Sequence, residues 1–149
     1  MERLSMGSLK SKLKKLTKPI LKKETETIIL RDREIVKRKK AELKGGVRPS
    51  GAIIGTYRSE RYRLFKLQLN PLARGNVDLI LTGSTKDQLY LVSLKDGSFT
   101  FESADPKWKG LVEKYGEEVK GINADVFRGL QQTRYAPELI QRMREITGL

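Results

Sequence analysis

The uneven distribution of charge along the chain constrains its fold more than any other feature. Residues 1–75 hold 21 Lys and Arg against 7 Asp and Glu, a net charge of +14, whereas the rest holds 10 against 11, a net charge of −1. Such asymmetry is typical of a segment that meets nucleic acid, an anionic membrane or an acidic protein. We therefore predict a basic helical arm and linker over residues 1–50 and a compact body over residues 51–149.

Two apolar stripes predict helices in the arm. The first stripe repeats at i, i+4, i+7 and i+11. It consists of Leu9, Leu13, Leu16 and Ile20. The second stripe predicts one continuous helix that ends at Gly45 and Gly46. It consists of Ile28, Ile29, Ile35, Val36 and Leu43. Both stripes are too narrow to form a core alone, so we expect a partner to supply most of the arm's order.

Basic side chains fill the other faces of these helices and are the candidate contacts to a partner. They are Lys10, Lys12, Lys14, Lys15, Lys18, Lys22, Lys23, Lys37, Arg38, Lys39 and Lys40. The run from Lys37 to Lys40 has two interpretations, a solvated helix face and a contact to an anionic partner. DNA and an acidic protein both suit the charge, and no stretch of 18 apolar residues predicts a membrane span.

The body contains strand patterns followed by helix patterns. Residues 78–82, 88–94 and 98–102 are strand candidates, and Asp96-Gly97 between the last two is typical of a tight hairpin. Residues 59–69 fit a helix capped by Ser59 and also fit a strand, because their apolar pattern allows both. The predicted fold class is α+β: a basic N-terminal helical arm, a small antiparallel β-meander, and C-terminal helices packed on the sheet.

The C-terminal helices carry the predicted core. Trp108, Leu111 and Tyr115 lie at helical spacing, and Gly116 ends their helix. We expect these three side chains to pack on the sheet rather than to stack on nucleic-acid bases. Asn123 is positioned to cap a short helix. The last helix is expected to begin at Pro137. Its predicted buried side consists of Leu139, Ile140, Met143 and Ile146.

The sequence Thr82-Gly83-Ser84-Thr85-Lys86 invites comparison with a phosphate-binding loop. Such a loop needs Gly-x-x-x-x-Gly-Lys-Ser/Thr, and here the second glycine is missing at that spacing. Gly83 therefore fits a turn between two strands. The chain has no histidine and no cysteine, so catalysis would depend on carboxylates, lysine or tyrosine. We predict no catalytic, cofactor or metal site, and we expect the protein not to be an enzyme.

The second half of the chain carries a series of motifs that resembles a known family. The motifs are NPLARGNVDLILTGSTKDQLYL, FTFESADPKWKGLVEKYG and the helix start at Gly121-Ile122-Asn123. They are similar to small structural proteins of tailed bacteriophages and prophages, the tail-completion or head–tail joining group. The resemblance implies a neck or minor tail protein that forms a homo-oligomeric ring with portal or tail neighbours. It also implies a protein that is made in the host cytoplasm and resides in the virion.

Two other functions remain open on the sequence. A free architectural or regulatory protein that binds nucleic acid is the first, although aromatic residues do not interleave with the lysines before Tyr57. A small enzyme that uses two carboxylates is the second, and a cleft with two perturbed carboxyl groups would support it.

Overall fold

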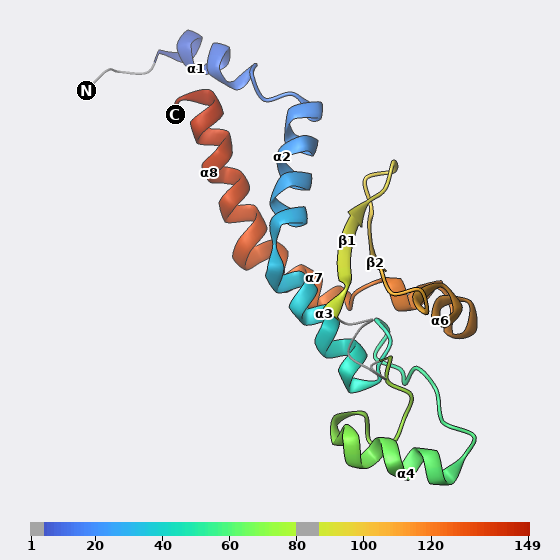
Figure 1. Cartoon of the computed structure of the whole chain (residues 1–149). Helices are drawn as coiled ribbons and strands as arrows, with labels where there is room; N and C mark the ends of the chain where they lie inside the picture. The colour runs from blue at the N-terminus through green and yellow to red at the C-terminus, as the bar shows by residue number, and fades with distance from the viewer. Residues whose placement is uncertain (1–4, 80–86) are drawn as a thin grey trace. The chain divides into compact units, whose positions relative to one another are not determined.

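The computed structural model describes residues 5–79 and 87–149, and they form two compact units (Figure 1). The helical unit consists of the described residues up to Asp32 together with Gly129–Leu149. The mixed unit is Arg33–Arg128. The C-terminal helix thus belongs to the same compact unit as the first N-terminal helices.

The helical unit contains three α-helices and one π-helical turn among its described residues. They are α1 (Met6–Leu13), α2 (Lys18–Arg31), η3 (Gln131–Tyr135) and α8 (Ala136–Thr147). The helix α8 contacts α2, and Figure 1 shows the two running side by side. The π-helical turn ends two residues before Pro137, which has no N–H to donate to the carbonyl four residues earlier.

Polar contacts at Asp32 join the end of α2 to the C-terminal segment. The Asp32 carboxylate accepts hydrogen bonds from Arg134 Nη2 at 2.9 Å and from the Tyr135 hydroxyl at 2.7 Å. Near the middle of the pair, Arg142 Nη1 donates to Glu24 Oε2 at 2.8 Å. These contacts lie beside a small apolar core, so the first half of the predicted arm packs against the last helix of the chain.

The long helix predicted from the second apolar stripe is wrong, because it is interrupted at Asp32. This residue adopts an extended conformation with φ −75° and ψ 111°, and a separate helix α3 (Arg33–Gly45) follows. Aspartate is a weak helix former, and its buried carboxylate is held by Arg134 and Tyr135. The break therefore reflects a tertiary contact.

The mixed unit combines short helices with one β-hairpin. Strands β1 (Leu89–Ser93) and β2 (Phe99–Ser103) pair antiparallel, with Leu91 opposite Phe101. The turn between them contains Gly97 at φ 85°, a conformation that glycine adopts readily. The helical elements are α3, α4 (Glu60–Leu69), η1 (Pro71–Ala73), α6 (Trp108–Tyr115), η2 (Glu117–Lys120) and most of α7 (Ala124–Leu130).

The predicted α+β class is confirmed, and two of the three predicted strands are present. Asp78 and Leu79, at the start of the other predicted strand, are not part of a strand. The rest of that strand and the predicted turn at Gly83 lie outside the described residues. The sheet of the described chain is thus a two-stranded hairpin.

The predicted core around Trp108 is confirmed in part. The Trp108 side chain is buried, and its Nε1 donates to Glu102 Oε2 of β2 at 2.9 Å. Leu111 and Tyr115 are only half-buried. Gly116 ends α6 at φ 95°, as predicted. The buried residues of α6 are therefore Trp108 and Val112, and Trp108 joins the helix to β2.

Local capping signals are confirmed. The Ser59 hydroxyl accepts from the backbone N–H of Tyr62, which settles residues 60–69 as a helix. The Asn123 side chain accepts from two backbone N–H groups at the start of α7. In α8 the expected burial of Ile140 is wrong, since the half-buried side of that helix is centred on Met143 and turns Ile140 to solvent. Across residues 5–79 and 87–149, no helix is long and apolar enough to cross a bilayer.

Candidate partner-binding surface

A run of exposed lysines covers α1, the link to α2 and the first turns of α2. We call residues 10–23 the lysine segment, and no acidic residue lies within it. Its exposed members are Lys10, Lys14, Lys15, Lys18, Lys22 and Lys23. None of these six forms an ion pair or a side-chain hydrogen bond with the residues that the structure describes. Their mutual repulsion is therefore left uncompensated by this part of the chain.

Lys12 differs from the other lysines of the segment. Its ammonium donates to the backbone carbonyl of Gly148 at 2.9 Å, just beyond the end of α8. A cation at a helix C-terminus interacts favourably with the helix dipole. Lys12 therefore attaches α1 to α8, and it is less accessible to a partner than its neighbours.

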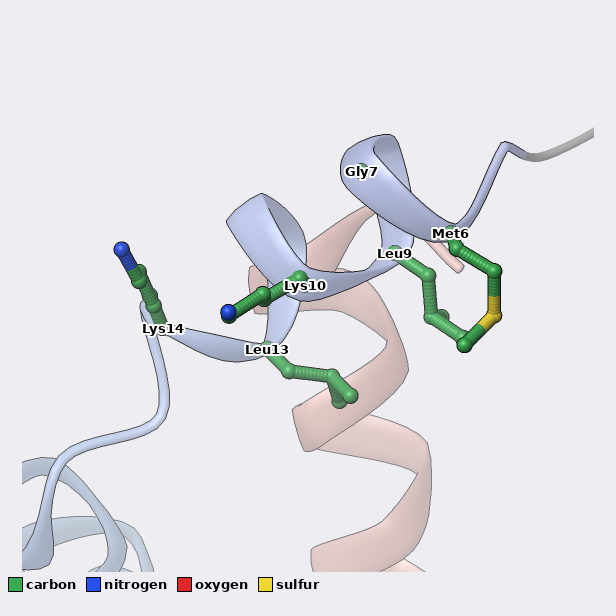
Figure 2. Close-up of a pocket in the computed structure, with 6 residues that line it drawn as sticks. All are labelled: Met6, Gly7, Leu9, Lys10, Leu13 and Lys14. Carbon is green, nitrogen blue, oxygen red and sulfur yellow. The ribbon is translucent and has the colours of Figure 1, made fainter.

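The helix α1 also presents apolar side chains to solvent (Figure 2). Met6 is 83% exposed, and Leu13 is also exposed. Together with Leu9 they line an open apolar groove on α1 that Lys10 and Lys14 border. In Figure 2 the side chains of Met6 and Leu9 lie next to each other, and those of Lys10 and Lys14 point away from them. The lysine segment thus offers a narrow apolar contact beside its charge.

The basic run in α3 does not form a single exposed cluster. Lys37 and Arg38 are exposed, and Arg38 Nε pairs with Glu34 Oε1 at 2.9 Å. Lys40 is half-buried. The expectation that Lys39 is exposed is wrong, since its side chain is 0% exposed. Only part of the run is therefore available to a partner.

Helical periodicity explains the burial of Lys39. It lies four residues from both Ile35 and Leu43, and all three face the interior of the mixed unit. Its ammonium is 3.1 Å from Glu42 Oε2 and 6.0 Å from the centroid of the Phe101 ring. Burial lowers the pKa of Lys39 from its ordinary value of 10.5, and Glu42 opposes that shift. The i±4 spacing to two apolar residues was the signal that could have identified this position.

The same carboxylate connects three parts of the mixed unit. Glu42 Oε1 accepts from the backbone N–H of Asn123 at 2.7 Å, while its other oxygen meets Lys39. The Asn123 side chain in turn donates to the carbonyl of Pro49 at 2.9 Å. The buried Lys39–Glu42 pair therefore belongs to a structural network.

A second buried lysine escaped the sequence analysis. Lys66 of α4 contacts the carboxylate of Asp78, and both side chains are almost fully buried. Asn70 Nδ2 donates to the same carboxylate at 2.7 Å, and the Tyr57 hydroxyl lies 3.5 Å from it. Burial and then the charge of Asp78 raise the pKa of Tyr57 well above its ordinary value of 10.0. Asp78 within the apolar run Val77–Leu79 was the signal, because a buried acid requires a partner.

The described residues do not form a metal-binding cluster beside these networks. No group of three or more Asp and Glu residues in this part of the chain is arranged to hold a metal ion. A hollow of about 160 Å³ lies between Ile28, Ile29 and Tyr135 in the helical unit. Sites for small ligands are usually larger. The surface best developed for recognition is therefore the lysine segment.

No protein-family model, curated protein or solved structure matches this chain. The resemblance to the tail-completion group is therefore untested by these comparisons and stays a hypothesis.

Proposed function

We propose that this chain is a non-enzymatic structural protein of a tailed-phage virion, a head–tail joining or tail-completion subunit. In this proposal the lysine segment contacts neighbouring neck, portal or tail subunits or the packaged DNA. The chain is made in the host cytoplasm, assembles into a homo-oligomeric ring and needs no cofactor. The resemblance of residues 70–149 to the joining family supports the place in the particle.

The single observation that carries the proposal is the uncompensated charge of the lysine segment. Six exposed lysines lie within residues 10–23, and none has a charge partner in the described chain. Holding like charges close together is unfavourable in the isolated protein. An anionic surface in an assembly relieves that repulsion, and the apolar groove of α1 adds area to the contact.

The experiment that tests the proposal is quantitative mass spectrometry of purified phage particles from the strain that encodes the chain. We expect the chain to stay with the particles through a density gradient, at a constant ratio to the major capsid protein. A chain that is absent from the particles, or whose ratio varies between gradient fractions, would contradict a structural role.

A free nucleic-acid-binding protein is the second candidate, and the same lysine segment favours it. No aromatic residue lies within residues 10–23, so binding would involve phosphates rather than stacked bases. Six phosphate contacts predict a loss of affinity of about a thousandfold between 50 and 200 mM salt. Tight binding to duplex DNA at physiological salt, combined with absence from particles, would favour this candidate over the first.

A further inference from the structure

The helix α1 places three large apolar side chains on one of its faces. Met6, Leu9 and Leu13 follow the spacing i, i+3 and i+7, which keeps them within about 60° of one another around the helix axis. Met6 is 83% exposed, Leu13 is also exposed, and Leu9 is half-buried. All three line the same open groove (Figure 2). We call these side chains the α1 apolar face.

The contact that attaches α1 to α8 leaves this face open. Lys12 Nζ donates to the carbonyl of Gly148 at 2.9 Å. Around the helix axis, Lys12 lies about 60° from Leu9 and about 120° from Met6. The contact is therefore at the side of the α1 apolar face, and the fold holds α1 with Met6 and Leu13 in solvent.

The charge beside the α1 apolar face is entirely positive. Lys10 and Lys14 border the groove, and the other exposed lysines of the lysine segment follow on the link and on α2. No acidic residue lies within residues 5–23. The next residue, Glu24, is paired with Arg142 at 2.8 Å. An apolar face beside such a charge is complementary to a surface that is both apolar and negatively charged.

We propose that α1 and the lysine segment bind the surface of an anionic lipid bilayer. The α1 apolar face enters the boundary between headgroups and acyl chains, and the lysines contact the lipid phosphates. Clusters of about four to eight Lys and Arg on an amphipathic helix are typical of anionic-lipid recognition. Such a helix lies in the plane of the membrane, so it does not need the length of a spanning helix. Lysine stems can cover apolar surface while their ammonium groups stay in water.

Duplex DNA and an acidic protein fit this combination less well than a bilayer does. The DNA backbone offers phosphates but no apolar layer that would cover Met6 and Leu13. Protein–protein interfaces are depleted in lysine and enriched in arginine, whereas residues 10–23 contain seven lysines and no arginine. Lysine carries a strongly hydrated point charge, which suits a headgroup layer that stays in contact with water. The inference concerns the free chain and goes beyond the proposed virion role, on which it does not depend.

The first experiment measures co-sedimentation of the full chain with lipid vesicles, after nuclease treatment and removal of nucleic acid at high salt. One set of vesicles is phosphatidylcholine alone, and the other contains about one third phosphatidylglycerol. At about 0.1 M salt we expect binding to the anionic vesicles to be at least about tenfold stronger than binding to the neutral ones.

Two matched double variants test the apolar part of the contact. Met6→Ser with Leu13→Ser should weaken binding to the anionic vesicles by at least about tenfold. It should leave the urea unfolding midpoint unchanged, because both side chains are exposed. The control is Leu64→Ser with Leu69→Ser, which removes two exposed apolar side chains from α4 and should bind the vesicles normally.

Duplex DNA serves as the comparison ligand for the same variants. Contacts to DNA phosphates would involve the lysines alone. Met6→Ser with Leu13→Ser should therefore bind duplex DNA as tightly as the natural chain does, while its binding to anionic vesicles falls.

The second experiment measures immersion of α1 with single cysteines, because the natural chain has none. Met6→Cys, labelled with a polarity-sensitive fluorophore, should shift its emission to the blue when anionic vesicles are added. Ser11→Cys is the matched control, since Ser11 is exposed on the same helix about 140° from Met6. Its label should shift less.

Four results would overturn the proposal. The first is a chain that does not bind anionic vesicles, whether or not it binds duplex DNA. The second is vesicle binding that Met6→Ser with Leu13→Ser leaves intact, because that outcome would show adsorption by charge alone. The third is an equal loss of DNA and vesicle binding in that variant, and the fourth is an equal emission shift at the two labelled positions. None of these results bears on whether the chain is found in phage particles, which the particle analysis decides separately.

Discussion

The helical unit and the mixed unit place lysine in opposite environments. Six lysines of the helical unit are exposed and have no ion pair with the described residues. In the mixed unit, Lys39 and Lys66 are fully buried and each contacts a carboxylate. The difference lies in the contacts that form: Glu42 pairs with Lys39 and Asp78 with Lys66, whereas no described acid pairs with the six exposed lysines. The same residue type is thus structural in one unit and available to a partner in the other.

The buried apolar residues are also distributed unequally between the two units. Most of them belong to the mixed unit, including Ile35, Leu43, Phe101 and Trp108. The helical unit buries fewer and adds the polar contacts of Asp32. Substitutions in the mixed unit should therefore change stability most, and substitutions of exposed lysines should change binding.

The largest effect is expected from breaking the buried pair of α4. Lys66→Met leaves the Asp78 carboxylate buried without its cation, so we expect the free energy of unfolding to fall by about 3–5 kcal/mol. Urea denaturation measures the change, with Lys22→Met of the lysine segment as the matched control. An equal effect of both substitutions would break the contrast between the two units. The double variant Lys66→Met with Asp78→Leu should recover much of the loss, since it removes both charges.

An intermediate effect is expected in the helical unit. Tyr135→Phe removes the hydroxyl that donates to Asp32, and leaving a buried acceptor unsatisfied costs about 1–3 kcal/mol. Amide hydrogen exchange should accelerate in α2 and α8 and stay unchanged in β1 and β2. Equal acceleration in the hairpin would show that the two units unfold as one and would remove the basis for treating them separately.

A smaller effect is expected in the pH dependence of stability. The pKa of Lys39 is lowered in the folded chain, so below pH 10.5 the unfolded chain binds this proton more strongly. The contribution of Lys39 to stability should therefore rise as the pH approaches 10.5 from the neutral range. Comparison of the natural chain with Lys39→Met between about pH 7 and pH 9.5 isolates this contribution and avoids the titration of Tyr57, whose pKa is raised. A constant difference across that range would contradict the assigned burial of Lys39.

Local chemistry allowed part of this fold to be predicted. Asp96-Gly97 identified the hairpin, and Ser59 and Asn123 identified helix starts, because each signal acts within a few residues. The break at Asp32 depends on Tyr135, which is 103 residues away in the sequence. Single-sequence patterns do not specify such a distant partner.

The exposure of the basic side chains could be predicted from the sequence for residues 10–23 but not for Lys39. The six lysines of residues 10–23 are exposed as expected, since no apolar pattern includes them. Lys39 was misassigned, because the charge of the Lys37–Lys40 run concealed its helical spacing to Ile35 and Leu43. The burial of Lys66 was not foreseen either, because it depends on the contact with Asp78.

The central claim is that the lysine segment serves a partner and not the fold. Its most direct test is the number of copies of a charge-reduced chain in purified particles, measured by mass spectrometry beside the natural chain. In the test variant Lys10, Lys14, Lys15, Lys18, Lys22 and Lys23 are all changed to Gln. A matched control changes six exposed basic residues of the mixed unit to Gln. They are Lys44, Arg74, Lys95, Lys107, Lys109 and Lys114. We expect the test variant to keep its unfolding free energy within about 0.5 kcal/mol. We also expect it to lose at least about tenfold in copies per particle, while the control is incorporated normally. Incorporation of the test variant at the natural level would contradict the account.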